Sequence, residues 1–181
     1  MKKIAIILIA SFIFTLGLCA YKTFQALTHP IKYENIIETW SKEFSIPSYI
    51  VASVINVESS YDEKAVSSKE ALGLMQIKLS TAQYICEYYK LDETIEKSDL
   101  LQAPKNIEYG CRYLKYLMNK FDDTFTALSA YNAGETRVRV WLKDENYSLD
   151  GKTLYNIPYK ETNNYIEKIK KNIKFYKKIY K

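Results

Sequence analysis

One glutamate of this chain, Glu58, stands where a side chain could do acid–base chemistry. The segment from Pro47 to Glu58 predicts a helix, on which Ile50, Val54 and Glu58 lie one turn apart on the same face. A carboxyl that continues an apolar stripe is partly desolvated and lies at the negative end of the helix dipole, and both effects raise its pKa. We therefore predict that Glu58 is a general acid. Position alone leaves one alternative open, a glutamate turned into water at a frayed helix end.

The other reactive side chains limit the kinds of catalysis that this chain could perform. The chain of 181 residues has a single histidine, His29, which follows an apolar N-terminus and lies outside any expected core. Ser-His-Asp triads, Cys-His dyads and histidine-built zinc sites all need an imidazole inside a packed pocket. Catalysis by this chain is therefore expected to use carboxylates, hydroxyls, amides or lysines.

Four short motifs, with Ser67 between the first two, follow one another along the chain. They are Glu58-Ser59, Gly73-Leu74-Met75-Gln76, Ala130-Tyr131-Asn132-Ala133-Gly134, and Ile157-Pro158 followed by Glu161-Thr162 and Tyr165. Together they resemble the catalytic domain of soluble lytic transglycosylases, of the goose-type lysozyme-like superfamily, over about residues 33–176. Four motifs in the same order are far more specific than any one of them.

The resemblance implies roles for the first group of matching residues. Glu58 matches the single catalytic acid/base of the family, and Ser59 would help to close the end of its helix. Ser67 matches a serine that hydrogen-bonds near the acetamido group of the substrate or near the glutamate. Gly73 would let the backbone approach the sugar closely, and Met75 would pack against a pyranose ring.

The later matches would complete a substrate-binding site. Gln76 would hydrogen-bond the sugar from below, and the hydroxyl of Tyr131 would reach toward the catalytic carboxyl. Asn132 would shape the turn behind Tyr131, while Glu161 and Tyr165 would line the far wall. For every residue other than Glu58, an ordinary role in the core, in a turn or as a helix cap stays open.

The resemblance also implies a reaction on the glycan strand of peptidoglycan. Glu58 would protonate the glycosidic oxygen between N-acetylmuramic acid and N-acetylglucosamine, and would then take the proton of the 6-hydroxyl that attacks the anomeric carbon. The product would be a 1,6-anhydro-N-acetylmuramic acid end, formed without metal or cofactor. A glycosidase of the usual kind needs a second carboxylate. Asp62 and Glu63 follow the helix in polar sequence, and the family uses neither position in that way.

Three other functions are compatible with parts of the sequence. A lysozyme-like hydrolase would let water attack in place of the 6-hydroxyl. A non-catalytic wall-binding module would hold acidic polymers through the basic tail, but it has no need of a desolvated glutamate beside Ile50 and Val54. Nucleic-acid binding through the lysines lacks any recognised module and conflicts with export.

Two departures from the family pattern flank the second motif. Glu70 stands where the family often has glycine, and Lys78-Leu79 replaces the more frequent apolar residue and proline. These changes affect the conformation of the loop and the charge near the substrate. Because neither touches Glu58, we expect an altered substrate preference and retained activity.

The elements that must position these residues are almost all helical. Apolar residues recur at spacings of three and four, and helix-starting residues precede several of these segments. The predicted helices span about 33–40, 47–58, 80–90, 106–118, 124–131, 137–143 and 161–180. The fold class is therefore all-α, a lysozyme-like α domain, with room for one small hairpin within residues 59–77.

The N-terminal 29 residues are predicted to serve export. Residues 4–21 carry no charge and would span about 27 Å as a helix, close to the thickness of a bilayer core. We interpret residues 1–29 as an uncleaved membrane anchor or a cleaved signal with a short linker, or as a lipoprotein signal ending at Cys19. Residues 30–181 would form the catalytic domain on the outer face of a bacterial cell membrane.

Charge and cysteines add two further expectations. The net charge is +3 over residues 1–29, −5 over residues 30–151 and +7 over residues 152–181, so the basic excess belongs to the two ends. Ile and Tyr interleave with the C-terminal lysines, which favours an amphipathic helix with a solvated basic face.

Cys86 and Cys111 could form a disulfide in an oxidising compartment or could remain buried thiols.

Overall fold

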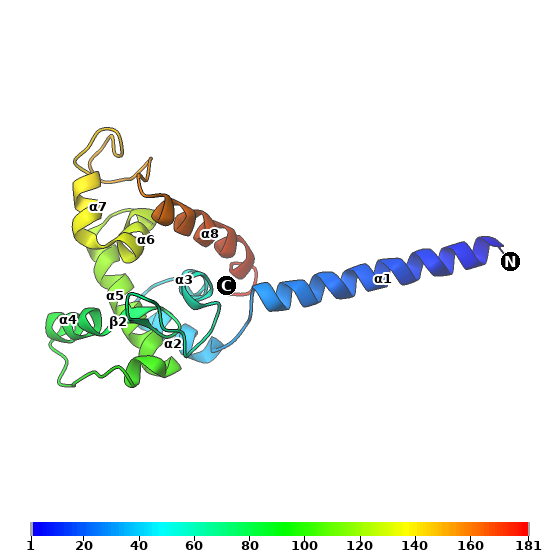
Figure 1. The fold of residues 1–181 in the computed structure, drawn as a ribbon, viewed down its shortest axis with the longest axis horizontal. Coiled ribbons are helices and arrows are strands. Elements are labelled where there is room, and N and C mark those ends of the chain that lie inside the picture. Colours follow the sequence, from blue (N-terminus) through cyan, green and yellow to red (C-terminus); the bar gives the residue numbers. More distant parts are fainter. Residues whose placement is uncertain (1, 181) are drawn as a thin grey trace. The chain divides into compact units, whose positions relative to one another are not determined.

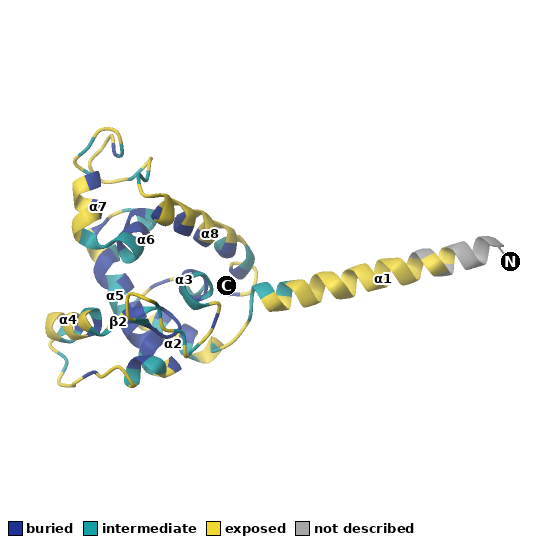
Figure 2. Ribbon diagram, in the orientation of Figure 1, coloured by how far each residue is buried: buried dark blue, intermediate teal, exposed yellow. Residues whose placement is uncertain are grey.

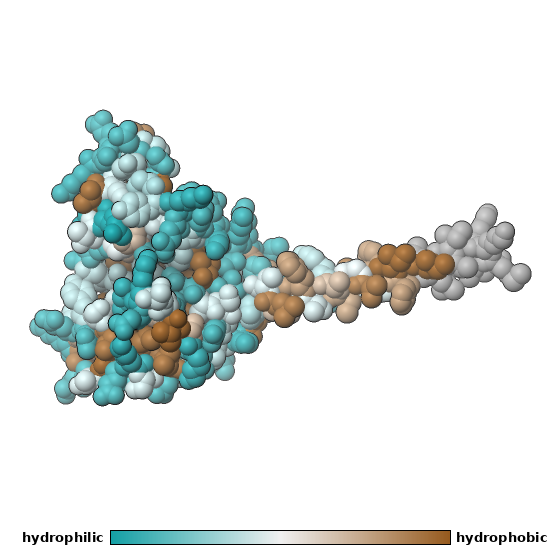
Figure 3. Space-filling model, viewed as in Figure 1, coloured by the Kyte–Doolittle hydropathy of each residue, from teal (hydrophilic) through white to brown (hydrophobic). Residues whose placement is uncertain are grey.

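The computed structural model describes residues 2–180, apart from the side chains of residues 2–6, 8 and 10. The chain divides into two compact units, residues 1–32 and residues 33–181. The first unit is built on one helix, α1 (Lys2–Thr28), whose described apolar side chains, Phe12 and Phe14 among them, are exposed. Figure 3 shows hydrophobic surface along the described part of this helix.

The predicted membrane span over residues 4–21 is not supported by the structure. Among the residues that it describes, no helix combines the length and the apolar character needed to cross a membrane. Five of the side chains in that segment, at residues 4–6, 8 and 10, lie outside the described ones.

The second unit is the body of the protein, and within residues 33–180 it is mostly helical with one small hairpin, as the sequence predicted (Figure 1). Its two strands are antiparallel and pair Ala71 with Lys78 and Leu72 with Ile77. In chain order the elements are α2 (Glu34–Glu43), α3 (Ser48–Ser59), β1 (Ala71–Leu72), β2 (Ile77–Lys78), α4 (Leu79–Tyr89), the 3-10 turn η1 (Asp99–Leu101), α5 (Ala103–Lys120), α6 (Thr124–Ala133), α7 (Glu135–Trp141) and α8 (Lys160–Tyr176).

The start of α5 differs from the prediction, which placed it at Asn106. The helix begins at Ala103, whose N–H donates to Glu63 Oε1 at 2.7 Å, and Pro104 occupies the first turn, where its missing N–H costs no hydrogen bond. Asn106 therefore lies inside the helix and is fully buried. Its polar side chain does not cap the helix but hydrogen-bonds the end of β1, the loop between β1 and β2, and η1.

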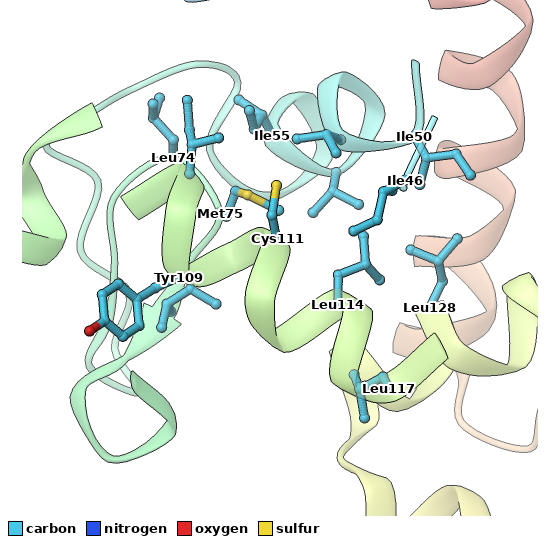
Figure 4. Close-up of a cluster of buried hydrophobic side chains, with 14 of the residues drawn as sticks. Ile46, Ile50, Ile55, Leu74, Met75, Tyr109, Cys111, Leu114, Leu117 and Leu128 are labelled. Atoms are coloured by element: carbon cyan, nitrogen blue, oxygen red, sulfur yellow. The ribbon is translucent and has the colours of Figure 1, made fainter. Parts of the chain in front are cut away.

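The core of the body gathers around α5. This helix packs against α2, α4 and α6, and its buried face carries Cys111, Leu114 and Leu117. Figure 4 shows these side chains together with Leu74 and Met75 of the loop between the two strands. The core thus fixes the hairpin loop against α5 and places it next to α3.

The last helix, α8, packs on α3 and α6 along one face. Its buried residues form a stripe that includes Tyr165, Ile166 and Ile169, while its lysines are exposed (Figure 2). The amphipathic helix with a solvated lysine face is therefore confirmed, although it ends at Tyr176 and not at residue 180.

The two cysteines of the body are free thiols. Cys111 is buried in the core, and burial raises the pKa of its thiol. Cys86 lies half-buried with its Sγ 2.9 Å from the hydroxyl of Tyr109. Both side chains therefore serve packing in this structure.

Candidate active site

Glu58 lies in the last turn of α3, where the apolar stripe of the helix leads out of the core. Ile50 and Val54 on the same face are buried, and Glu58 itself is half-buried. Burial raises the pKa of the Glu58 carboxyl to about 7; the nearby Tyr165 hydroxyl opposes this rise, and the negative charge of Glu161 adds to it. A carboxyl with this pKa is both protonated and charged in comparable amounts near neutral pH, as a group that must give and take a proton requires.

Two tyrosine hydroxyls lie close to Glu58. Tyr131, on α6, donates its hydroxyl proton to the carbonyl oxygen of Met75 at 2.8 Å, so it presents only lone pairs to other groups. Tyr165, on α8, is buried, and its hydroxyl acts on Glu58 without reaching full hydrogen-bond geometry to any described group. Burial and the charge of Glu58 raise the pKa of both phenols, so both stay protonated.

Three polar side chains that the sequence analysis predicted for the site form hydrogen bonds within the segment between α3 and the end of the hairpin loop. The hydroxyl of Ser59 donates to the carbonyl oxygen of Leu74 at 2.9 Å, which joins the end of α3 to the hairpin loop. The hydroxyl oxygen of Ser67 accepts from the N–H of Ala71 at 3.0 Å. Gln76 donates from Nε2 to the carbonyl oxygens of Gly73 and Ala65, at 2.9 and 3.2 Å. Its Oε1 makes no bond to the described residues.

Gly73 and Met75 are both buried in the core. Gly73 has φ +68°, and a Cβ there would collide with the side-chain amide of Asn106 and the carbonyl of Leu100. The Met75 side chain is fully buried beside Gly110, where a Cβ would collide with its sulfur (Figure 4). The expected packing of Met75 on a pyranose ring is therefore corrected: its side chain fills the core, and its carbonyl binds Tyr131.

The remaining residues of the last two motifs divide between the interior and the surface. Asn132 accepts the hydroxyl proton of Thr162 through Oδ1 at 2.8 Å, which joins α6 to α8. Glu161 is exposed and pairs with Lys69 at 3.8 Å, across from α8 to the segment before the hairpin. An exposed pair of this length contributes little stability. The structure therefore brings Glu58, Tyr131 and Tyr165 together, with Glu161 within electrostatic reach.

Left-handed backbone is concentrated around this site. Ser60, Tyr61, Glu70 and Gln76 all have positive φ, at 53°, 64°, 58° and 49°. Such a conformation costs a residue with a side chain about 1 kcal/mol. Glu70 stands where the family pattern often has glycine, and its φ explains why a glycine suits that position.

Sequence reasoning missed Asn106, which holds the hairpin loop. Its Oδ1 accepts from the N–H of Met75 at 2.7 Å, and its Nδ2 donates to the carbonyl oxygens of Leu72 and Leu100 at 2.8 and 2.7 Å. Gly110, one turn later, leaves room for Met75. The signal in the sequence was a polar residue, Asn106, and a glycine, Gly110, four positions apart on the apolar face of one helix. This pattern indicates that another segment packs closely against that face.

The raised pKa of Glu58 predicts a stability effect. The folded state holds the carboxyl proton more tightly than the unfolded chain, so its stability falls as pH rises from about 4.5 to about 7 and then stays low. Glu58→Gln, which cannot be charged, should unfold at nearly the same temperature as the original chain at pH 4. Above pH 7 we expect the variant to be more stable by roughly 3 kcal/mol.

Thermal unfolding followed by circular dichroism across this pH range measures the effect. Glu167→Gln is the control, because Glu167 is an exposed carboxyl of α8 whose pKa the Lys170 ammonium lowers. An equal stability difference at pH 4 and pH 8 for Glu58→Gln would contradict the burial of a carboxyl with a raised pKa.

Comparison with known proteins places these residues in context. Residues 35–161 match the family described as the transglycosylase SLT domain. The soluble lytic murein transglycosylase of Escherichia coli K12 is 29% identical over 142 residues, which cover 77% of this chain and 22% of that protein. The membrane-bound lytic murein transglycosylase C of Mannheimia succiniciproducens is 27% identical over 170 residues, covering 81% of this chain and 47% of that protein.

Solved structures show the same likeness. The 70 kDa soluble lytic transglycosylase of Escherichia coli superposes with a TM-score of 0.76 and 26% identity over 87% of this chain and 26% of that chain. An inactive mutant of a lytic transglycosylase from Pseudomonas aeruginosa gives a TM-score of 0.75 at 26% identity, over 86% of this chain and 25% of that one. The chain thus spans about a quarter of the length of the structures it resembles.

Proposed function

Because this chain belongs to the transglycosylase SLT domain family, we propose that it is a lytic transglycosylase that cleaves the β-1,4 bond between N-acetylmuramic acid and N-acetylglucosamine in peptidoglycan. One observation carries the proposal: Glu58 is a half-buried carboxyl whose pKa is raised to about 7. The resemblance in sequence assigns the catalytic role of the family to this position. The bond breaks without water, and the product has a 1,6-anhydro-N-acetylmuramic acid end.

In the first step, protonated Glu58 acts as the general acid. It donates its proton to the glycosidic oxygen, and the bond from that oxygen to the anomeric carbon breaks, so that N-acetylglucosamine leaves with a new hydroxyl. Positive charge develops at the anomeric carbon. The carboxylate left on Glu58 is favoured by the nearby Tyr165 hydroxyl, which lowers the pKa that burial alone would give.

In the second step, the Glu58 carboxylate acts as the general base. It takes the proton of the 6-hydroxyl of the same N-acetylmuramic acid, whose oxygen forms the bond to the anomeric carbon. Glu58 regains its proton, so the cycle closes with no cofactor and no water consumed. Because nucleophile and electrophile belong to one sugar, little entropy is lost in bringing them together.

A lysozyme-like hydrolase would need a second carboxyl group in the site, whereas the proposed reaction uses Glu58 alone. A retaining or inverting hydrolase places a second carboxyl about 5 Å or about 6.5–9.5 Å from the first. Glu161, the carboxylate that acts on the pKa of Glu58, is exposed and paired with Lys69. A solvated, paired carboxylate suits a wall of the site better than a nucleophile.

The remaining residues of the site are proposed to position the sugar. Gln76 offers its free Oε1, and Ser67 offers the hydroxyl proton that its contact with Ala71 leaves unused. Glu161 offers an exposed carboxylate. Ser59, Gly73, Met75 and Asn132 then act through the backbone and the loop that they hold in place.

The pH dependence of cleavage should follow the proton on Glu58. The acid form starts the reaction, so the rate should fall above pH 7, about tenfold for each further pH unit. Glu161→Gln removes a charge that raises this pKa and should move the fall to lower pH. Tyr165→Phe removes a hydroxyl that lowers it and should move the fall to higher pH. Initial rates of wall solubilisation between pH 5 and 9 measure both, and shifts of the same sign would contradict this account.

Export is the proposed fate of the protein, because its substrate lies outside the cytoplasm. We propose that residues 1–29, as a signal or an anchor, direct residues 30–181 to the outer face of a bacterial cell membrane. Cell fractionation, with N-terminal sequencing of the mature protein, tests this; full-length protein confined to the cytoplasm would contradict it.

Digestion of purified peptidoglycan by the full-length chain tests the activity itself. We expect soluble muropeptides with anhydro ends, separated by liquid chromatography and identified by mass. Products heavier by one water would identify a hydrolase. Tight wall binding without any product would identify a binding module and overturn the enzymatic proposal.

A further inference from the structure

Lys69 lies at the edge of the site and has no part in the reaction proposed above. Its Nζ is 3.8 Å from Oε1 of Glu161, and the charge of Glu161 in turn acts on the pKa of Glu58. The ion pair therefore joins the segment before β1 to the first turn of α8 beside the catalytic carboxyl. The side chains of Lys69 and Glu161 are 72% and 74% exposed, so a ligand can reach both charges.

A short turn fixes the backbone of Lys69. The N–H of Glu70 donates to the carbonyl oxygen of Ser67 at 3.0 Å, and the N–H of Ser67 donates to the carbonyl oxygen of Ala71 at 2.9 Å. The hydroxyl oxygen of Ser67 accepts from the N–H of Lys69 at 3.3 Å and from that of Ala71 at 3.0 Å. Only the flexible stem of the lysine side chain therefore has to move when the ammonium changes its partner.

The positive charge of Lys69 is available to a ligand. The neighbouring carboxylate, Glu70, is paired with Nζ of Lys97 at 3.2 Å. Within residues 33–180, the one ion pair of Lys69 is the pair with Glu161. An exposed pair at this distance is weak, so a carboxylate of a ligand can replace Glu161 at little cost.

The proposed substrate brings carboxylates to this place. In peptidoglycan the sugar rings are uncharged, and the free carboxylates belong to the stem peptides. Each peptide is attached through the lactyl group at carbon 3 of N-acetylmuramic acid, the same sugar whose anomeric carbon would react at Glu58. A sugar bound in this way starts its peptide about one ring away from Glu58, where a long cationic side chain can bind a carboxylate.

We propose that Lys69 is a specificity-determining residue, whose ammonium exchanges Glu161 for a carboxylate of the stem peptide. This inference rests on the proposed function. It makes the charge of the peptide part of substrate recognition: strands whose stem peptides carry free carboxylates bind more tightly, and strands whose carboxylates are amidated gain nothing from Lys69.

The test compares two forms of one substrate. Soluble glycan fragments that retain their stem peptides are used as isolated and after a carbodiimide and excess ammonia have converted their carboxylates to amides. The KM of the original full-length chain should be about threefold lower for the form with free carboxylates, the effect of one exposed ion pair. Lys69→Gln should lose this preference. The original chain should lose it in about 0.5 M salt, which screens an exposed pair.

Lys97→Gln is the matched control. Lys97 is also an exposed lysine with one carboxylate partner, and its replacement changes the net charge by the same amount. This variant should keep the threefold preference of the original chain. Substitutions of exposed side chains seldom affect stability, so both variants should fold, which circular dichroism verifies.

Several results would overturn the inference. One is a preference that survives in Lys69→Gln, and another is an equal loss in Lys97→Gln, which would reflect net charge alone. An altered pH dependence of kcat with an unchanged preference would show that Lys69 acts on Glu58 through Glu161 and not on the peptide. If the original chain cleaves neither form, the proposed function fails, whereas cleavage of both forms with equal KM removes the role of Lys69 alone.

Discussion

Glu58→Gln should lower the rate of peptidoglycan cleavage about a thousandfold. Removing a general acid or base commonly costs between about a hundredfold and ten-thousandfold, and here one carboxyl serves in both steps. Glutamine keeps the size and the polarity of the side chain but neither donates an acidic proton to the glycosidic oxygen nor accepts one from the 6-hydroxyl. Initial rates of release of soluble muropeptides from purified walls measure the loss.

The control for this experiment is Glu87→Gln, an exposed glutamate of α4, which should retain the full rate. Circular dichroism and binding of N-acetylglucosamine oligomers should be preserved in both variants. A Glu58→Gln protein that keeps its rate within a few-fold would rule out the proposed acid and base.

Asn106→Leu should destabilise the body by about 4 kcal/mol. Leucine has the same branched shape as asparagine but leaves the N–H of Met75 and the carbonyl oxygens of Leu72 and Leu100 buried without their partners. Each buried group left unpaired costs about 1–3 kcal/mol. The midpoint of thermal unfolding should fall by roughly 10 °C.

Activity should also fall in Asn106→Leu, because Asn106 holds the loop whose Met75 carbonyl binds Tyr131. Asn119→Leu, an exposed change on the same helix, should alter neither stability nor rate. An Asn106→Leu protein that unfolds at the same temperature as the original would show that the loop does not depend on this amide.

The sequence predicted the helical fold and the place of Glu58 because both follow from local periodicity. Ile50, Val54 and Glu58 occupy one face whatever the rest of the chain does, and α3 spans residues 48–59, close to the predicted 47–58. The amphipathic α8 could be predicted for the same reason. Features that depend on one helix alone can be predicted from the spacing of its apolar residues.

Features that arise between distant segments could not be predicted in this way. Asn106 looked like a helix cap because its partners, Leu72 and Met75, are more than 30 residues away along the chain. Met75 looked available to a sugar because its contact with Gly110 exists only in the folded core.

The burial of Glu58 affects both the stability of the fold and the proposed catalysis. Burial that gives the carboxyl a pKa of about 7 also makes its charged form costly to the folded state. The same group should therefore be the most important for rate and a source of instability above neutral pH. Such a trade between activity and stability is common at catalytic sites.

The source of the oxygen at the cleaved anomeric carbon tests the proposed reaction most directly. Purified peptidoglycan is digested by the full-length chain in water enriched in a heavy oxygen isotope, and the muropeptide products are analysed by mass spectrometry. The intramolecular mechanism predicts anhydro products that carry no heavy oxygen, because the 6-hydroxyl of the sugar supplies the attacking atom. Products that gain one water with a heavy oxygen at the anomeric carbon would contradict it and identify a hydrolase.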